Sequence, residues 1–93
     1  MDNIATRITD TLKRSGLTAR NLAAMANVHY TTIYLIVKKG ENAKPLPAVL
    51  DSLDRALVLL DTFVAEHKLP LPAELSQVAK QAKLAQLISD HNS

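Results

Sequence analysis

Apolar residues recur at helical spacing along most of the chain, and no stretch shows the strict alternation of a β-strand. The longest such stretch, residues 47–67, has one continuous apolar stripe opposite a charged side. The stripe consists of Val49, Leu50, Leu53, Ala56, Leu57, Leu60, Phe63 and Val64. With 93 residues, the chain has the length of one domain with a modest core. The pattern therefore predicts an all-α fold.

Residues that start or end helices divide the chain into five predicted helices, at residues 3–15, 19–26, 29–38, 47–67 and 73–89. Gly16 takes the left-handed conformation that closes the first helix at little cost, and the Thr18 hydroxyl suits the N-cap of the second. Asn27 suits a tight turn, and Pro47 suits a first helical turn. We expect residues 1–68 to form one unit with a long fourth helix, and residues 69–93 to form a proline-containing linker and a last helix.

The last helix is predicted to present one apolar stripe to the rest of the chain. Its members are Leu75, Val78, Ala79, Ala82 and Ala85, whereas Leu84, Leu87 and Ile88 are expected to project elsewhere.

Composition excludes several classes of site. The chain has no cysteine, which excludes a disulfide scaffold, a thiolate zinc site and a cysteine nucleophile. Two glycines do not make a glycine-rich phosphate loop, and the three histidines are too scattered for a metal site. No apolar run approaches the ~18 residues of a membrane span, and the N-terminus lacks a signal pattern. We expect a cytoplasmic protein, in a bacterium or a phage-infected cell, with no metal, cofactor, small-molecule ligand or enzyme activity.

The small net charge of +2 hides an asymmetry between the two halves of the chain. Residues 1–44 contain seven basic and three acidic residues, a net charge of +4. Residues 45–93 contain four basic and six acidic residues, a net charge of −2. The basic half indicates contact with a polyanion.

The predicted helix at 29–38 has two unlike faces. Helical spacing puts His29, Thr32, Ile33, Ile36 and Val37 on one side. It puts Tyr30, Thr31, Tyr34, Leu35 and Lys38 on the other. The second face carries two of only three aromatic residues in the chain, and we expect it to be exposed to solvent.

Residues 19–26 and 29–38, joined at Asn27 and Val28, have the proportions of a helix-turn-helix. Residues 17–40 resemble the helix-turn-helix core of the phage-repressor/Cro-like (XRE-type) family. The matching positions are Leu17, Thr18, Leu22, Ala23, Val28, Thr32, Ile33 and Ile36, and Leu50, Leu53, Ala56 and Leu57 resemble the packing residues of the following helix. Ala19, Asn27 and His29 depart from the family pattern, which has Gln, Gly and a Ser or Thr cap there, so we expect His29 to cap poorly. The single helix at 47–67 also departs from it, because the family has a break there.

The resemblance implies a lambda-repressor-like core of four helices, here followed by a C-terminal helix. Leu22, Ala23, Val28, Ile33 and Ile36 would form the core of the motif, and the helix at 29–38 would enter the major groove of DNA. The side chains expected to read bases are Tyr30, Thr31, Tyr34 and Leu35. Those expected to contact phosphates are Thr18, Arg20, Lys38, Lys39 and Lys44. Alternatively, the tyrosines pack on the first helix or on a protein partner, Leu35 belongs to a protein interface, and the lysines form a solvated edge.

The apolar surplus in residues 55–90 predicts a homodimer, with a compact monomer as the alternative. The expected interface residues are Val58, Leu59, Phe63, Leu75, Val78, Leu84, Leu87 and Ile88. The resulting hypothesis is a sequence-specific transcriptional regulator, a phage or bacterial repressor that binds double-stranded DNA as a homodimer. Two alternatives stay open: an accessory DNA-binding protein of phage DNA packaging or transposition, and a protein-interaction module that uses the tyrosine-rich face.

Overall fold

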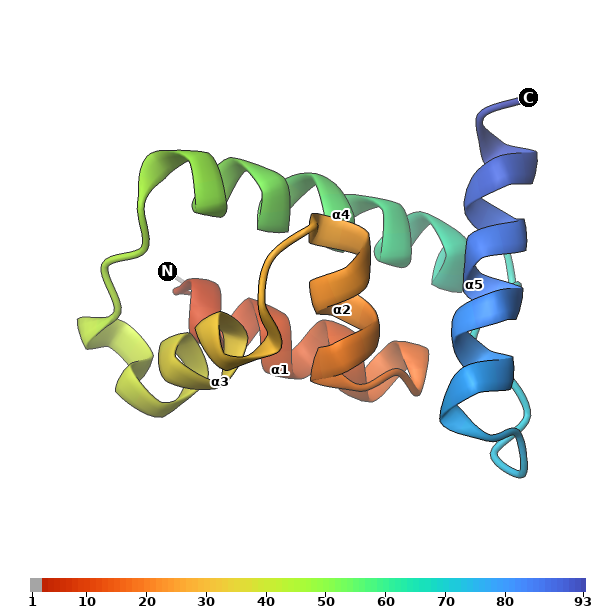
Figure 1. Cartoon of the computed structure of the whole chain (residues 1–93), viewed down its shortest axis with the longest axis horizontal. Coiled ribbons are helices and arrows are strands. Elements are labelled where there is room, and N and C mark those ends of the chain that lie inside the picture. The colour runs from red at the N-terminus through yellow and green to blue at the C-terminus, as the bar shows by residue number, and fades with distance from the viewer. Residues whose placement is uncertain (1–2) are drawn as a thin grey trace.

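The computed structural model describes residues 3–93, which form five α-helices and a short 3₁₀ helix and contain no strand (Figure 1). The helices are α1 (Ile4–Ser15), α2 (Ala19–Ala26), α3 (Tyr30–Lys39), η1 (Gly40–Asn42), α4 (Pro47–Ala65) and α5 (Gln77–His91). The predicted all-α fold is therefore confirmed. Residues 1 and 2 of the predicted unit 1–68 lie outside the described residues.

The predicted helix ends are confirmed at the positions where the sequence has a residue suited to capping a helix. Gly16 closes α1 with φ of 70°, and Asn27 closes α2 with φ of 56°, both in the left-handed region. Thr18 begins α2: its hydroxyl accepts a hydrogen bond from the backbone N–H of Asn21 (3.3 Å), and the Asn21 side chain accepts one from the backbone N–H of Thr18 (3.0 Å). This reciprocal pair fixes the start of α2, and Pro47 stands in the first turn of α4 as expected.

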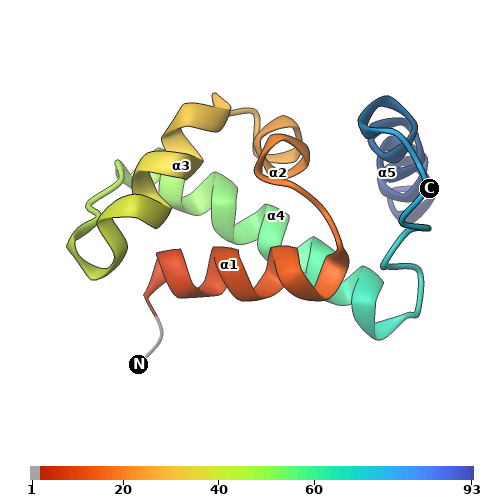
Figure 2. The same cartoon turned by 90° about the horizontal axis from the view of Figure 1, so that it is seen from below.

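Among the first four helices, α1 packs beside α4, α3 packs on α1 and α2, and α2 packs on α4 (Figure 2). Fully buried side chains from every α-helix belong to one core: Ile8, Leu22, Ile33, Leu53, Leu57, Leu60, Phe63 and Leu84. α4 continues without a break to Ala65, as the sequence predicted, and its stripe supplies half of that set.

α5 packs with the opposite face to the one predicted. Leu84 is fully buried and Leu87 and Ile88 pack against the core, whereas Val78, Ala82 and Ala85 are exposed. The helix also begins at Gln77 rather than residue 73. The physical reason is area: leucine and isoleucine one turn apart remove more apolar surface from water than alanines do.

The contact between α5 and α2 also has a polar part. The Asn21 side chain, which is fully buried, donates a hydrogen bond to the Gln81 side chain at 2.9 Å. At the other end of α5, the His91 ring meets the Phe63 ring edge-on, with centroids 5.8 Å apart. These contacts fix which face of α5 turns inward.

This packing corrects part of the predicted dimer interface. Phe63 and Leu84 are fully buried within the single chain, so they cannot contact a second copy. Leu59, Leu75, Leu87 and Ile88 are partly buried, and only Val58 and Val78 of the predicted set are largely exposed.

Candidate nucleic-acid interface

α3 turns the predicted polar and aromatic face outward. Ile33 and Ile36 are buried between α3 and the neighbouring helices, while Tyr34 and Leu35 are 54% and 55% exposed. Thr31 and Lys38 are also exposed. Val37, expected on the buried side, is 40% exposed, because α3 lies on α1 and α2 along a narrow line that Ile33 and Ile36 already fill.

The remaining motif-core positions behave as the resemblance implied. Leu22 and Ala23 of α2 are buried against the core. Val28, directly after the turn, is partly buried and packs on the same cluster.

Tyr30 is less exposed than predicted. It is partly buried and packs against the core, so it serves packing within the chain; the predicted contact with a base stays a prediction. The Arg20 guanidinium lies over the ring, 4.1 Å from its centroid. The His29 ring stacks on Tyr30 at 4.8 Å, and the Tyr34 ring meets it edge-on at 5.7 Å. Arg20, His29 and Tyr34 thus all contact the Tyr30 ring, and we call these four side chains the aromatic row.

His29 caps α3, contrary to the expectation from its residue type. Its Nδ1 accepts a hydrogen bond from the backbone N–H of Thr31 at 3.3 Å. The Thr31 hydroxyl lies 2.8 Å from the same nitrogen. An imidazole with an unprotonated Nδ1 can thus replace a serine hydroxyl as the acceptor for a first-turn N–H.

Thr18 is engaged within the chain rather than free for a phosphate. Its hydroxyl accepts from the Asn21 backbone N–H and donates to the side-chain oxygen of Asn21 (3.0 Å) or of Gln77 (3.3 Å). A hydroxyl has only one proton to donate. A phosphate contact through this hydroxyl, which stays a prediction, would require its proton to leave these side-chain oxygens.

Most of the basic residues fall into two groups. Arg7, Arg14, Arg55 and Lys68 each form an ion pair with a carboxylate, at Asp54, Asp61, Asp51 and Glu66 respectively. Among residues 3–93, no ion pair involves the predicted phosphate-binding set of Arg20, Lys38, Lys39 and Lys44, and none involves Lys13, Lys80 or Lys83. Positive charge without an ion pair thus lies beside the aromatic row and along the end of α3, and also on α1 and α5.

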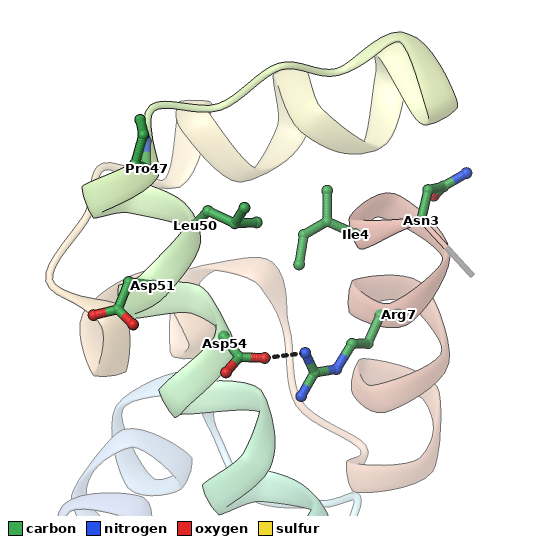
Figure 3. A pocket seen from close by; sticks show the side chains of 7 residues that line it. All are labelled: Asn3, Ile4, Arg7, Pro47, Leu50, Asp51 and Asp54. Carbon is green, nitrogen blue, oxygen red and sulfur yellow. Dashed lines mark hydrogen bonds and ion pairs between the residues drawn. The ribbon is translucent and has the colours of Figure 1, made fainter. Parts of the chain in front are cut away.

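Two grooves flank the α4 N-terminus. The first lies between α1 and α4, where Ile4 and Leu50 point toward each other and Arg7 reaches Asp54 (Figure 3). The charged residues along this groove are paired within the chain, Arg7 with Asp54 and Asp51 with Arg55. The second groove lies between α3 and the start of α4, and sequence reasoning missed it. Its available signal was Leu46, an apolar residue directly before a helix-starting proline.

Within the part of the chain that the structure describes, no helix combines the length and the apolarity needed to cross a membrane. In that same part, no three His, Asp or Glu side chains come together in a way that could hold a metal ion. Comparisons with models of protein families, with curated proteins and with solved structures found no match for this chain. The resemblance of residues 17–40 therefore stays a prediction.

Proposed function

We propose that the protein binds double-stranded DNA in a sequence-specific manner through α3, as a cytoplasmic transcriptional repressor. The observation that carries the proposal is that the aromatic row adjoins cations, Arg20, Lys38, Lys39 and Lys44, that form no ion pair within residues 3–93. Exposed rings and a threonine supply groups for base edges, and the adjacent cations supply groups for phosphates.

The dimensions of α3 suit this role. The ten residues of α3 make a helix about 15 Å long. The major groove, about 12 Å wide, admits one helix across its width. The outward residues Thr31, Tyr34 and Leu35 would face the bases, with Tyr30 at the entry to the groove and Lys38 toward the phosphates.

Arg20 has a defined direction in this arrangement because the Tyr30 ring holds its guanidinium. A guanidinium that is already ordered loses less conformational freedom on binding than a free side chain does. It stands in the first turn of α2, where the positive end of the helix dipole also favours a phosphate.

A homodimer is part of the proposal. Two copies would place two α3 helices on successive major grooves, and a bound operator would exclude competing proteins such as polymerase. Val58 of α4 and Val78 of α5 are the exposed apolar side chains from which such an interface would be built. Sedimentation of Val58→Ser and Val78→Ser tests this: an unchanged mass for both, compared with the unaltered chain, excludes an interface at either residue.

Selection of bound duplexes from a random pool tests the function itself. We expect enrichment of a palindromic sequence, since a two-fold dimer reads two half-sites. Affinity for that site should fall steeply between 50 and 200 mM salt, because bound lysines release counterions. Binding without sequence preference would instead support an accessory protein of packaging or transposition. The absence of duplex binding at low salt would reject both.

A further inference from the structure

The groove between α3 and the start of α4 combines an apolar floor with a basic rim. It has a volume of about 310 Å³. Its apolar lining is formed by Leu35, Ile36, Ala43, Pro45, Leu46 and Val49, and its basic rim by Lys39 and Lys44. Leu35 and Leu46 are 55% and 71% exposed, so two large apolar side chains stand open to solvent on either side of the groove.

The position of Leu46 is unfavourable for folding alone. It is the N-cap of α4 and makes no side-chain hydrogen bond to the first turn, where Ser, Thr, Asp or Asn would satisfy an open N–H. Its side chain gains little from burial within the chain. An apolar residue in this place is therefore better explained by contact with a second molecule.

The charges around the groove indicate which charge that molecule should carry. The segment from residue 29 to residue 50 contains three lysines, Lys38, Lys39 and Lys44, and a single acidic residue, Glu41. Within residues 3–93, none of these lysines has a carboxylate partner. The rim therefore attracts an anionic ligand, while the floor requires an apolar one.

We propose that this groove binds an acidic amphipathic segment of a partner protein, with apolar side chains on Leu35 and Leu46 and carboxylates on Lys39 and Lys44. A DNA backbone satisfies the rim only, because its phosphates and sugars offer no side chain for the apolar floor. An amphipathic helix offers both, since leucines one turn apart enter the groove and glutamates flank them.

The second part of this inference rests on the proposed function. Lys39 and Lys44 are also the predicted phosphate contacts of the DNA-bound state. A segment that neutralises them would compete with DNA, so the partner would release the protein from its operator.

The probe for the experiment is a fluorescein-labelled 14-residue peptide with leucine at every third or fourth position and glutamate elsewhere. Its controls are a peptide of the same composition whose leucines do not share one helix face, and a peptide with lysine in place of every glutamate. We expect the amphipathic acidic peptide to bind the full chain at low salt, at least ten times more tightly than either control.

Variants locate the site. Leu46→Ser should weaken peptide binding about tenfold or more, because it removes the buried contact of one leucine. Lys39→Gln with Lys44→Gln should reduce both affinity and its salt dependence. Leu50→Ser, at an exposed leucine of α4 that lines the other groove, should leave peptide binding unchanged. Since Leu46 and Leu50 are both exposed, neither change removes a core contact.

The outcomes separate this inference from the proposed function. No peptide binding, equal binding of the scrambled peptide, or an unchanged affinity of Leu46→Ser overturns the groove proposal and leaves DNA binding intact. A sedimentation coefficient that falls in Leu46→Ser overturns it as well, because the groove would then hold a second copy of this chain. Peptide binding by a chain that binds no duplex supports the groove and rejects the DNA proposal.

Discussion

Basic side chains have different surroundings in two regions of the molecule, the contact between α1 and α4 and the outer face of α3. Between α1 and α4, Arg7 pairs with Asp54 and Arg14 with Asp61, so these two positive charges are matched inside the chain. On α3 and the segment that follows it, Lys38, Lys39 and Lys44 have no such match among the described residues. The difference shows which cations hold helices together and which stay available to a partner.

The two regions also differ in how their helices end. A Cβ added at Gly16, which closes α1, would meet the side chain of Pro70, whereas a Cβ added at Gly40, which follows α3, would have no atom within 4 Å. Changes on the α1–α4 side should therefore act on stability, and changes on the α3 side should act on binding.

The largest effect is expected for the triple change Lys38→Gln, Lys39→Gln and Lys44→Gln. If each lysine neutralises one phosphate, the salt slope should fall by about 3 and affinity at 0.1 M salt by roughly 100-fold. The melting temperature should stay unchanged, since these side chains are exposed and unpaired. Fluorescence titration with duplex DNA measures the affinity. A matched triple change of Lys13, Lys80 and Lys83 to Gln should cost far less, and an equal loss would contradict the special role of α3.

Tyr34→Ala should lower the ratio of specific to random DNA binding by roughly tenfold, because one base-reading side chain is lost. Tyr34→Phe keeps the edge-on contact with Tyr30 and removes only the hydroxyl, so it distinguishes the contribution of the hydroxyl from that of the ring. Competition assays with selected and random duplexes give the ratio. Equal weakening on both duplexes would show that Tyr34 reads no base.

Gly16→Ala should destabilise the fold by about 1–2 kcal/mol, because alanine is strained at φ of 70° and its Cβ would lie 3.0 Å from the Pro70 Cβ. In a domain of this size, each kcal/mol lowers the melting temperature by about 4–8 °C. Gly40→Ala has no atom within 4 Å of the added Cβ, but at φ of 60° and ψ of −127° it needs a backbone conformation that alanine reaches at higher cost than the left-handed one, so it should cost at least as much. Thermal unfolding compares the two variants, and a clearly smaller loss for Gly40→Ala would contradict a fixed backbone at the end of α3.

The smallest effect is expected for Arg7→Gln. The ion pair to Asp54 is partly exposed, with 33% and 52% of the two side chains accessible, so its loss should cost less than about 1 kcal/mol. DNA affinity should change less than twofold, which would separate this arginine from the α3 lysines. A drop in affinity as large as that of a single lysine change would place Arg7 at the interface instead.

Local chemistry made much of the fold predictable. Gly16, Thr18, Asn27 and Pro47 each require a particular backbone position, and the helices end or begin at them as expected. The outward direction of Tyr34 and Leu35 followed from helical spacing alone. Such features depend on neighbours within one or two turns, which a sequence displays directly.

Features that depend on distant residues were missed. The inward face of α5 is decided by whether Leu84 or Val78 reaches the core, and both belong to plausible apolar stripes. The pair of Arg7 with Asp54 joins residues 47 positions apart, and that of Asn21 with Gln81 joins residues 60 apart. The cap at His29 was missed for another reason. Histidine is not among the usual N-cap residue types, but its imidazole can turn Nδ1 toward the first turn of the helix and accept a hydrogen bond there.

Titration of the isotope-labelled protein with the selected duplex, followed by backbone amide shifts, tests the central claim most directly. The account predicts large shifts at Arg20, along Tyr30–Lys39 and at Lys44, and small shifts along the outward face of α4 from Asp51 to Val58. Shifts concentrated on α4 or α5, with α3 unaffected, would contradict it.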